Sequence, residues 1–421
     1  MPVLQWAQRR NCRRNEYPSG DYCMISFENS NWIQEQQQYT ESIAREHIRP
    51  DARYYDDHEH EFPWNFAKLI WNTARHKIDS LKPDAVASEE RFMLQIHINE
   101  MMSWGDLGYY MCLPWPALGG TFIKVVGTEK QKEQVKEKFK NPKPTWICMA
   151  LTESHCGSDS SAIRTRAVKD GDSWILNGEK LFVSTAKMSL IESDGILVAW
   201  ATIDPSAGSK GIRAFVVEAN TPGVKITKLE KKLGLRASDT AVVVFEDCRI
   251  PLENMLGGES SKGFKGAMAT FDAARPAAAA AGLGIARAVV DFVKEQLALQ
   301  GIKIRYGVPR TRLSSIERDI VDMEAQLRAT WLLVVKCAWL IDQQKPSTLI
   351  SSMCKAKAGE VATKIAQKGI ELMGSVGYSR NLLLEKWMRD AKVIDLFEGT
   401  GQINRLVVAR RILGYSSKEL K

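Results

Sequence analysis

Two features that would assign this chain to a special class are missing from it: closely spaced cysteine pairs and long apolar runs. Its eight cysteines are scattered without any C-x-x-C spacing, which is typical of free thiols in a reducing compartment rather than of a disulfide framework. The longest apolar run, residues 277–286, is rich in Ala and Gly and is too short to span a membrane. We therefore expect no membrane insertion and a location in the cytoplasm, or in the mitochondrial matrix if the source is eukaryotic.

A strong charge of one sign is also missing. The 58 basic and 50 acidic residues leave a net charge of +8, spread along 421 residues. This balance argues against a nucleic-acid partner, although it suits an anionic, phosphate-bearing substrate. A chain of this length exceeds one ordinary hydrophobic core, so two or three domains are expected.

The first residues carry no recognisable targeting signal. The segment is basic but has no apolar core, and it contains Glu16 and Asp21. These properties exclude a secretory signal and disfavour a transit peptide, which is poor in acids. We interpret residues 1–26 as a disordered or mis-started extension, with Met24 as the natural beginning.

Hydrophobic spacing divides the rest of the chain into three regions. Residues 27–144 and 261–421 repeat apolar side chains at three- and four-residue intervals, which predicts helices, and Gly374 is expected to end one of them. Residues 145–260 alternate as strands do, and Asn177-Gly178 predicts a hairpin turn. The predicted fold class is therefore α+β and multidomain, with an N-terminal helical domain, a middle antiparallel β domain and a C-terminal helical domain.

The chemistry is expected near the C-terminus, in residues 388–415. Glu398 follows the apolar residues Leu396 and Phe397, and poor solvation of a carboxylate raises its pKa and makes its charged form a stronger base. Gly399 allows a ligand to approach the backbone closely. Thr400 and Gln402 add a hydroxyl and an amide beside the acid.

Four motifs, in order along the chain, resemble those of the acyl-CoA dehydrogenase family. The resemblance extends over essentially the whole length from Met24. The motifs occupy residues 44–50 with 55–56, residues 151–159, residues 235–240 with 245–251, and residues 389–410. The resemblance implies a C-terminal four-helix bundle, FAD as cofactor, and the α,β-dehydrogenation of an acyl thioester to its trans-2-enoyl form.

Within this resemblance, Glu398 matches the base that removes the α-proton, and its backbone N–H would bond the thioester carbonyl. Some members of the family carry the base instead beside an Asp-x-x-Arg element. Here that element reads FDAAR, residues 271–275, with alanines and no spare carboxylate, which favours Glu398. The alternative is an ordinary acid in a loop before a helix.

The resemblance also implies a set of flavin contacts. Phe182 stands where the family usually has Trp, and an aromatic core residue of a strand is the alternative interpretation. The positions matched to the flavin and its nearby ribityl and dinucleotide parts are Met149, Leu151, Thr152, Ser158, Phe182, Ser184, Thr400 and Gln402.

Several departures fall where the family binds the far end of FAD across a subunit interface. Lys303 replaces an Arg, so a bidentate grip becomes a point charge unless Arg305 replaces it. Tyr306 follows, and Glu371 stands in place of Gln near Gly374. We expect weaker FAD binding or altered packing of the implied homo-oligomer, a tetramer or a dimer.

The thioester and its carrier arm are assigned by the same resemblance to Ser158, Arg236, Ser238, Arg275 and Gly399. For each arginine a structural ion pair is the alternative. Coenzyme A and acyl carrier protein share the pantetheine arm, so the sequence does not separate them, and a short, branched or cyclic acyl group is expected.

No metal is implied. An acceptor such as electron-transfer flavoprotein is expected. Alternative functions are an acyl-CoA oxidase, an acyl-carrier-protein-linked dehydrogenase, or a non-catalytic thioester-binding homologue.

Overall fold

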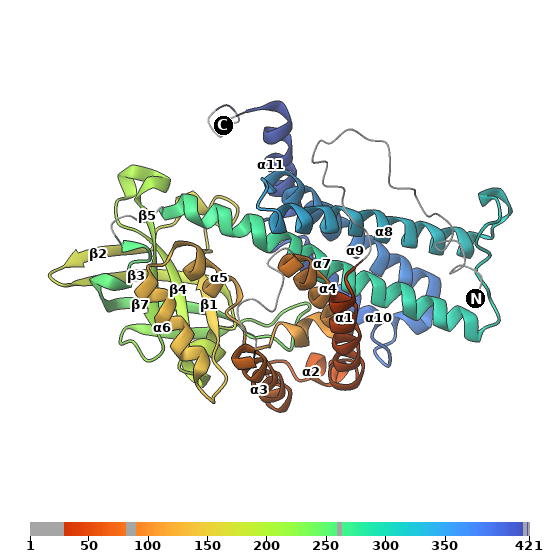
Figure 1. The fold of residues 1–421 in the computed structure, drawn as a ribbon, viewed down its shortest axis with the longest axis horizontal. Helices are drawn as coiled ribbons and strands as arrows, with labels where there is room; N and C mark the ends of the chain where they lie inside the picture. Colours follow the sequence, from red (N-terminus) through yellow and green to blue (C-terminus); the bar gives the residue numbers. More distant parts are fainter. Residues whose placement is uncertain (1–28, 81–89, 259–262, 416–418, 420–421) are drawn as a thin grey trace.

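The computed structural model describes residues 29–80, 90–258, 263–415 and 419, so the predicted extension at residues 1–26 lies outside the described residues. Helices precede and follow a single curled sheet, and the sheet occupies one end of the molecule (Figure 1). This order confirms the predicted fold class.

The first set of helices begins and ends at residues that explain its bounds. Ser30 caps α1 by accepting a hydrogen bond from the Ile33 N–H, and the helix leads through a short π-helical turn that ends before Pro50. A capping box of Thr128 and Gln131 starts α6. The helices are α1 (Asn31–Ile43), α2 (Ala52–Asp57), α3 (Trp64–Ser80), α4 (Arg91–Tyr110), α5 (Ala117–Val126) and α6 (Glu129–Lys140).

The described strands form one seven-stranded sheet in the order β1-β4-β2-β3-β7-β6, with β5 paired to β4. Most pairs are antiparallel as predicted, except that β1 and a single residue of β2 lie parallel to β4. Helix α5 packs on β1 and shares the core of Phe122, Ile147 and Trp200. The strands are β1 (Ile147–Ala150), β2 (Arg166–Asp170), β3 (Ser173–Ser184), β4 (Ile196–Thr202), β5 (Ile212–Glu218), β6 (Val224–Leu229) and β7 (Thr240–Pro251).

The predicted hairpin at Asn177-Gly178 is wrong, because β3 continues through these residues. The turn between β2 and β3 lies earlier, at Gly171 with φ 61°. Gly178 is required for a different reason: a Cβ atom there would lie 2.5 Å from the Thr165 Oγ1. The strand is bulged at this point, so the glycine serves close packing rather than a turn.

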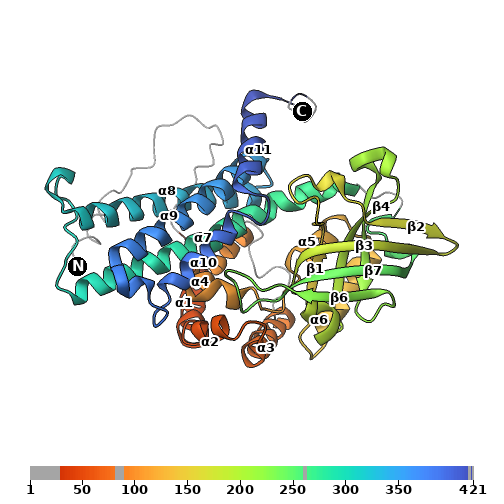
Figure 2. The same cartoon turned by 180° about the vertical axis from the view of Figure 1, so that it is seen from behind.

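The remaining helices form a bundle that extends away from the sheet (Figures 1 and 2). Helix α7 is long and apolar enough, by length and composition, to cross a membrane between Thr270 and Leu299, but 72% of its most apolar window is buried inside the fold. Gly374 interrupts α9 with φ 56°, and helical structure resumes after it. The helices are α7 (Gly263–Leu299), α8 (Ser315–Asp342), α9 (Thr348–Tyr378), α10 (Leu384–Ile394) and α11 (Gly401–Leu413).

A buried polar network fixes α10 against both halves of the chain. The fully buried Lys386 donates hydrogen bonds to Asp106 of α4 and to Asp390 of its own helix. Asp390 in turn accepts from the backbone N–H of Leu235 at 2.6 Å. Because buried charges are stable only when paired and hydrogen-bonded, this network positions the segment that leads from α10 into Glu398.

Candidate active site

Glu398 lies in a tight turn between α10 and α11. Both Glu398 and Gly399 have positive φ, 57° and 87°, a region that a residue with a Cβ atom enters only at a cost of about 1–3 kcal/mol. The turn is closed by a bond from the Gly401 N–H to the Asp395 carbonyl. Thr400 begins α11 by accepting from the Ile403 N–H. The local backbone therefore aims one carboxylate in a fixed direction.

The carboxylate of Glu398 lies in a dry environment as predicted, but not because of its sequence neighbours, since Leu396 is 53% exposed and Phe397 is half-buried. Among the described residues its buried Oε2 atom has no hydrogen-bond partner. Burial raises the pKa of Glu398 to about 7, against the opposing effects of Lys355 and Arg275. A carboxylate with this pKa is poised to accept a proton near neutral pH.

Two cations stand near this acid. Arg275 of α7 is buried, and it bonds Asp272 at 2.8 Å and the Ser352 Oγ at 3.4 Å. Its charge acts on Glu398, and Asp272 is occupied by this ion pair and by Thr348. The FDAAR sequence contains no carboxylate besides Asp272.

The second cation, Lys355, was not singled out by sequence reasoning. It is fully buried on α9, and its Nζ donates to the Gly399 carbonyl at 3.1 Å. The signal available in the sequence was helical spacing, because Lys355 shares a buried face with Ser351, Ser352 and Gly359. A lysine on such a face of small residues indicates a buried partner.

The loop of residues 151–159 meets α11 across a cavity of about 380 Å³. Ser158 is exposed on the loop side. On the helix side the cavity is lined by Arg410, whose Nε is buried with no hydrogen-bond partner among the described residues. Arg410 ends the fourth sequence motif, residues 389–410, and the sequence predicted no role for it. The full lining is Ser158, Asp159, Ile403, Leu406, Val407 and Arg410.

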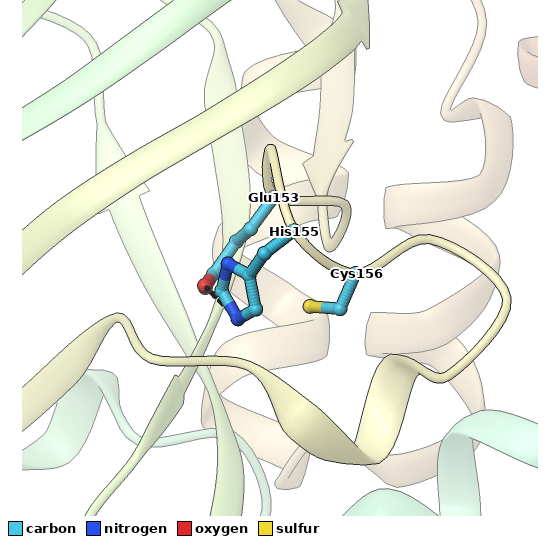
Figure 3. A group of neighbouring side chains, drawn as sticks. All are labelled: Glu153, His155 and Cys156. Carbon is cyan, nitrogen blue, oxygen red and sulfur yellow. Dashed lines mark ion pairs between the residues drawn. The ribbon is translucent and has the colours of Figure 1, made fainter.

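The same loop contains a group with metal-ligand chemistry. One ligand atom each from Glu153, His155 and Cys156 lies within 4.8 Å of the others (Figure 3). The Glu153 Oε1 is already bonded by Lys180 at 2.6 Å and by Thr165. His155 Nε2 lies 2.9 Å from a backbone carbonyl, to which it can only donate. The carboxylate charge is thus balanced by a lysine, and the group is an ion-paired support for the loop.

The flavin-assigned residues of the β domain lie on β1, on the loop that follows it and at the end of β3. Phe182 is 61% exposed with φ 55°, so the alternative of a core strand aromatic is wrong. Ser184 is exposed nearby, and the Thr152 carbonyl accepts from the Leu181 N–H at 2.9 Å. An exposed aromatic at a strained backbone position offers a flat apolar surface to a ring. The half-buried members of this set are Met149, Leu151 and Thr152.

The residues assigned to the far end of FAD are not brought to this place within one chain. Lys303 and Tyr306 lie in the α7–α8 connection, at the end of the bundle farthest from the sheet (Figure 1). Arg305 bonds the buried Glu317 at 2.7 Å, so it makes an ion pair instead of remaining free. Glu371 is exposed and bonds Lys368, close to Gly374.

The loop before β7 was assigned to the carrier arm. Arg236 lies 3.5 Å from Glu59, in agreement with the ion-pair alternative for this arginine. Ser238 is buried, and its carbonyl accepts from Lys232 at 2.5 Å. Both residues lie on the loop whose Leu235 N–H is held by α10, so this loop is coupled to the turn that carries Glu398.

Comparison with known families matches two consecutive parts of the chain. Residues 148–248 match the model described as "Acyl-CoA dehydrogenase, middle domain". Residues 261–413 match the one described as "Acyl-CoA dehydrogenase, C-terminal domain". Together the matches span more than half of the chain and include Glu398 and the sheet.

Whole-chain relatives agree with these matches. The short-chain specific acyl-CoA dehydrogenase of Rattus norvegicus mitochondria is 36% identical over 88% of this chain and 87% of its own length. An acryloyl-CoA reductase (NADH) of Anaerotignum propionicum is 38% identical over 68% of this chain and 71% of its own. The solved butyryl-CoA dehydrogenase of Megasphaera elsdenii superposes with a TM-score of 0.81, at 28% identity, and covers 92% of this chain and 100% of that one.

Proposed function

The chain belongs to the acyl-CoA dehydrogenase family of FAD-dependent oxidoreductases, and we propose that it dehydrogenates a short acyl thioester with Glu398 as the α-proton base. The observation that carries this proposal is the carboxyl group of Glu398, whose buried Oε2 has no hydrogen-bond partner in the described part of the chain and whose pKa burial raises to about 7. Relatives named for short-chain and butyryl substrates support the short acyl group.

FAD fits the residues present, because the exposed Phe182 offers an apolar face and Ser184 and Thr152 offer polar groups beside it. When bound, FAD supplies the acceptor for the β-hydrogen and its electron pair. The residues proposed to hold it are Met149, Leu151, Thr152, Ser158, Phe182, Ser184, Thr400 and Gln402. Lys303 belongs to the α7–α8 connection, which lies at the end of the bundle away from the sheet that carries Phe182, and this supports a homo-oligomer in which a second copy completes the site.

In the proposed reaction Glu398 accepts the α-proton of the thioester on its Oε2 and becomes a neutral acid. The C–H bond breaks toward an enolate, whose oxygen is stabilised by the Glu398 backbone N–H. Arg275 adds positive charge on the α7 side. Ser158 and Arg410 line the approach and offer a hydroxyl and a guanidinium to the carrier arm. The dry surroundings strengthen each of these interactions.

We assign the carrier as coenzyme A, because the anionic nucleotide of CoA suits the guanidinium of Arg410 at the cavity. The electron acceptor is proposed to be an electron-transfer flavoprotein, and the location the cytoplasm or the mitochondrial matrix. An acyl-CoA oxidase remains the second candidate, since it would use the same base and flavin but pass electrons to oxygen.

The test is the colour of the purified protein. We expect a yellow protein whose flavin absorbance bleaches anaerobically on addition of butyryl-CoA, whereas a colourless protein, or a flavin that no acyl-CoA bleaches, would overturn the proposal. Repeating the reduction in air separates the dehydrogenase from the oxidase, because only the oxidase is rapidly reoxidised with release of hydrogen peroxide.

A further inference from the structure

Lys355 has no role in the proton transfer described above, yet it is buried completely and stands next to Glu398. Its side chain crosses from α9 to the Glu398 turn and lies over the Phe397 ring, with 5.7 Å between Nζ and the ring centroid. Burying a lysine in this way costs free energy unless its charge is paired and hydrogen-bonded. Burial lowers the pKa of Lys355 to about 8, even though Glu398 and Asp395 oppose the decrease.

The contact that Lys355 makes is with the backbone of the turn. The Gly399 carbonyl accepts hydrogen bonds from Lys355 Nζ at 3.1 Å and from Asn404 Nδ2 at 2.8 Å. Glu398 and Gly399 both have positive φ, so the turn is not a regular helical ladder, and these donors hold it together with the bond from the Gly401 N–H to the Asp395 carbonyl. The two donors come from different helices, α9 and α11, and they fix the Gly399 carbonyl, one residue after the base.

The charged and titratable groups around the pair come from several elements. Glu398 is influenced by Lys355 of α9 and Arg275 of α7. Lys355 is influenced by Glu398, Asp395, Arg275 and the neighbouring Cys354. Arg275 is already paired with Asp272, and Asp395 with Lys392. Of the two cations near Glu398, Lys355 is therefore the one that forms no salt bridge with another carboxylate among the described residues.

We propose that Lys355 is the positioning residue of the base: its ammonium group holds the Glu398 turn through the Gly399 carbonyl and supplies the positive charge that favours the ionised form of Glu398. The proposal rests on the proposed role of Glu398. Near neutral pH the positive charge of Lys355 keeps Glu398 ionised and available as a base, whereas burial alone would keep it protonated. Without this positive charge, burial raises the pKa of Glu398 further, so Glu398 takes up a proton at a higher pH.

The experiment uses the full-length protein carrying FAD and compares Lys355→Met with Lys355→Arg. The rate of anaerobic flavin reduction by butyryl-CoA is measured across pH. For Lys355→Met we expect the acid limb to move up by about one pH unit, a tenfold loss of rate on that limb, with recovery at alkaline pH. Lys355→Arg should restore the original limb because the guanidinium stays charged. Lys364→Met, an exposed lysine on the same helix that pairs with Glu360, is the matched control.

Asn404→Ala separates the charge from the hydrogen bond. It removes the other donor to the Gly399 carbonyl and leaves Lys355 in place, so we expect a lower maximal rate with an unmoved acid limb. The proposal is overturned if Lys355→Met keeps the original limb, if it loses rate equally at every pH without rescue by Arg, or if Asn404→Ala moves the limb as far as Lys355→Met does.

A second readout needs no turnover. Infrared difference spectra of each protein against its Glu398→Gln counterpart follow the protonated carboxyl group of Glu398 as pH changes. We expect that titration to shift upward in Lys355→Met and to remain in place in Lys355→Arg. If the wild-type flavin is not reduced by any acyl-CoA, the proposed function fails while this titration still decides the role of Lys355. Should Lys355→Met not fold, Lys355→Gln provides the same neutral side chain for both readouts.

Discussion

Two glutamates of this molecule, the buried Glu153 and the half-buried Glu398 with its buried Oε2 atom, each have a buried lysine nearby, and they differ in what the lysine does. In the β domain, Lys180 bonds the Glu153 carboxylate directly, together with Thr165 and the Arg164 N–H. Between α10 and α11, Lys355 bonds the Gly399 carbonyl instead, and the Glu398 Oε2 is left without a hydrogen-bond partner among the described residues.

The electrostatic result is opposite at the two places. Burial alone would raise the pKa of Glu153, but Lys180 and the surrounding hydrogen bonds bring it below its ordinary value. At Glu398 burial prevails and raises the pKa to about 7. A fully bonded carboxylate supports structure, whereas one left short of partners is available for chemistry.

The largest expected effect comes from removing the carboxylate that is short of partners. Glu398→Gln should bind FAD and butyryl-CoA but lose flavin reduction by about 10²–10⁴-fold, because a positioned base contributes about that much. Stopped-flow absorbance of the flavin measures it. Glu137→Gln, on the exposed face of α6, is the control. An unchanged rate of flavin reduction in Glu398→Gln would show that the base is another residue, and the contrast between Glu398 and Glu153 would no longer hold.

The second-largest effect, on stability, is expected at Glu153, the carboxylate that is fully hydrogen-bonded. Lys180→Met leaves Glu153 buried without its counter-charge, and we expect the free energy of unfolding to fall by about 3–5 kcal/mol. Adding Glu153→Gln should recover part of this loss. Denaturant unfolding measures both. Lys225→Met, which breaks the exposed pair with Glu246, should cost less than about 1 kcal/mol. Equal costs for the two lysine variants would contradict the comparison.

The raised pKa of Glu398 predicts a stability effect with a definite sign. The folded state holds the proton up to a pH of about 7 and the unfolded state only to about 4.3, so the stability due to Glu398 is lost as pH rises between these values. Glu398→Gln should therefore unfold with a free energy about 4 kcal/mol higher than wild type at pH 8. The difference should vanish near pH 4. A thermal-unfolding series across pH measures it, and a constant difference would disprove a titration at this site.

The smallest effect is expected at His155. Its imidazole lies 3.8 Å from Glu153 and bonds a backbone carbonyl, while Lys180 already neutralises the acid. His155→Ala should change the unfolding free energy by less than about 0.5 kcal/mol. Added zinc should not raise the melting temperature of either protein. A zinc-dependent rise in wild type that is absent from His155→Ala would turn this group into a metal site.

Much of the fold could be predicted because hydrophobic spacing reports on elements directly. The helices around residues 27–144 and 261–421 and the strands between them follow from period alone. The error at Asn177-Gly178 has a physical cause: the dipeptide permits a turn, but the approach of Thr165 to Gly178, which comes from pairing between strands, decided that β3 continues. Phe182 was open to two interpretations for the same reason, since period does not say which face of a strand is covered.

What the sequence determined by itself was the identity of the acid at Glu398 and the glycine that follows it, because both are local. The dry surroundings of the carboxylate were decided by packing, since the neighbouring Leu396 is 53% exposed. The tertiary structure alone decided which cations face it. Lys355 and Arg275 reach the turn from α9 and α7, and Arg410 meets Ser158 across the cavity. Charges separated by many residues interact according to distance and dielectric, and both of these are set by packing.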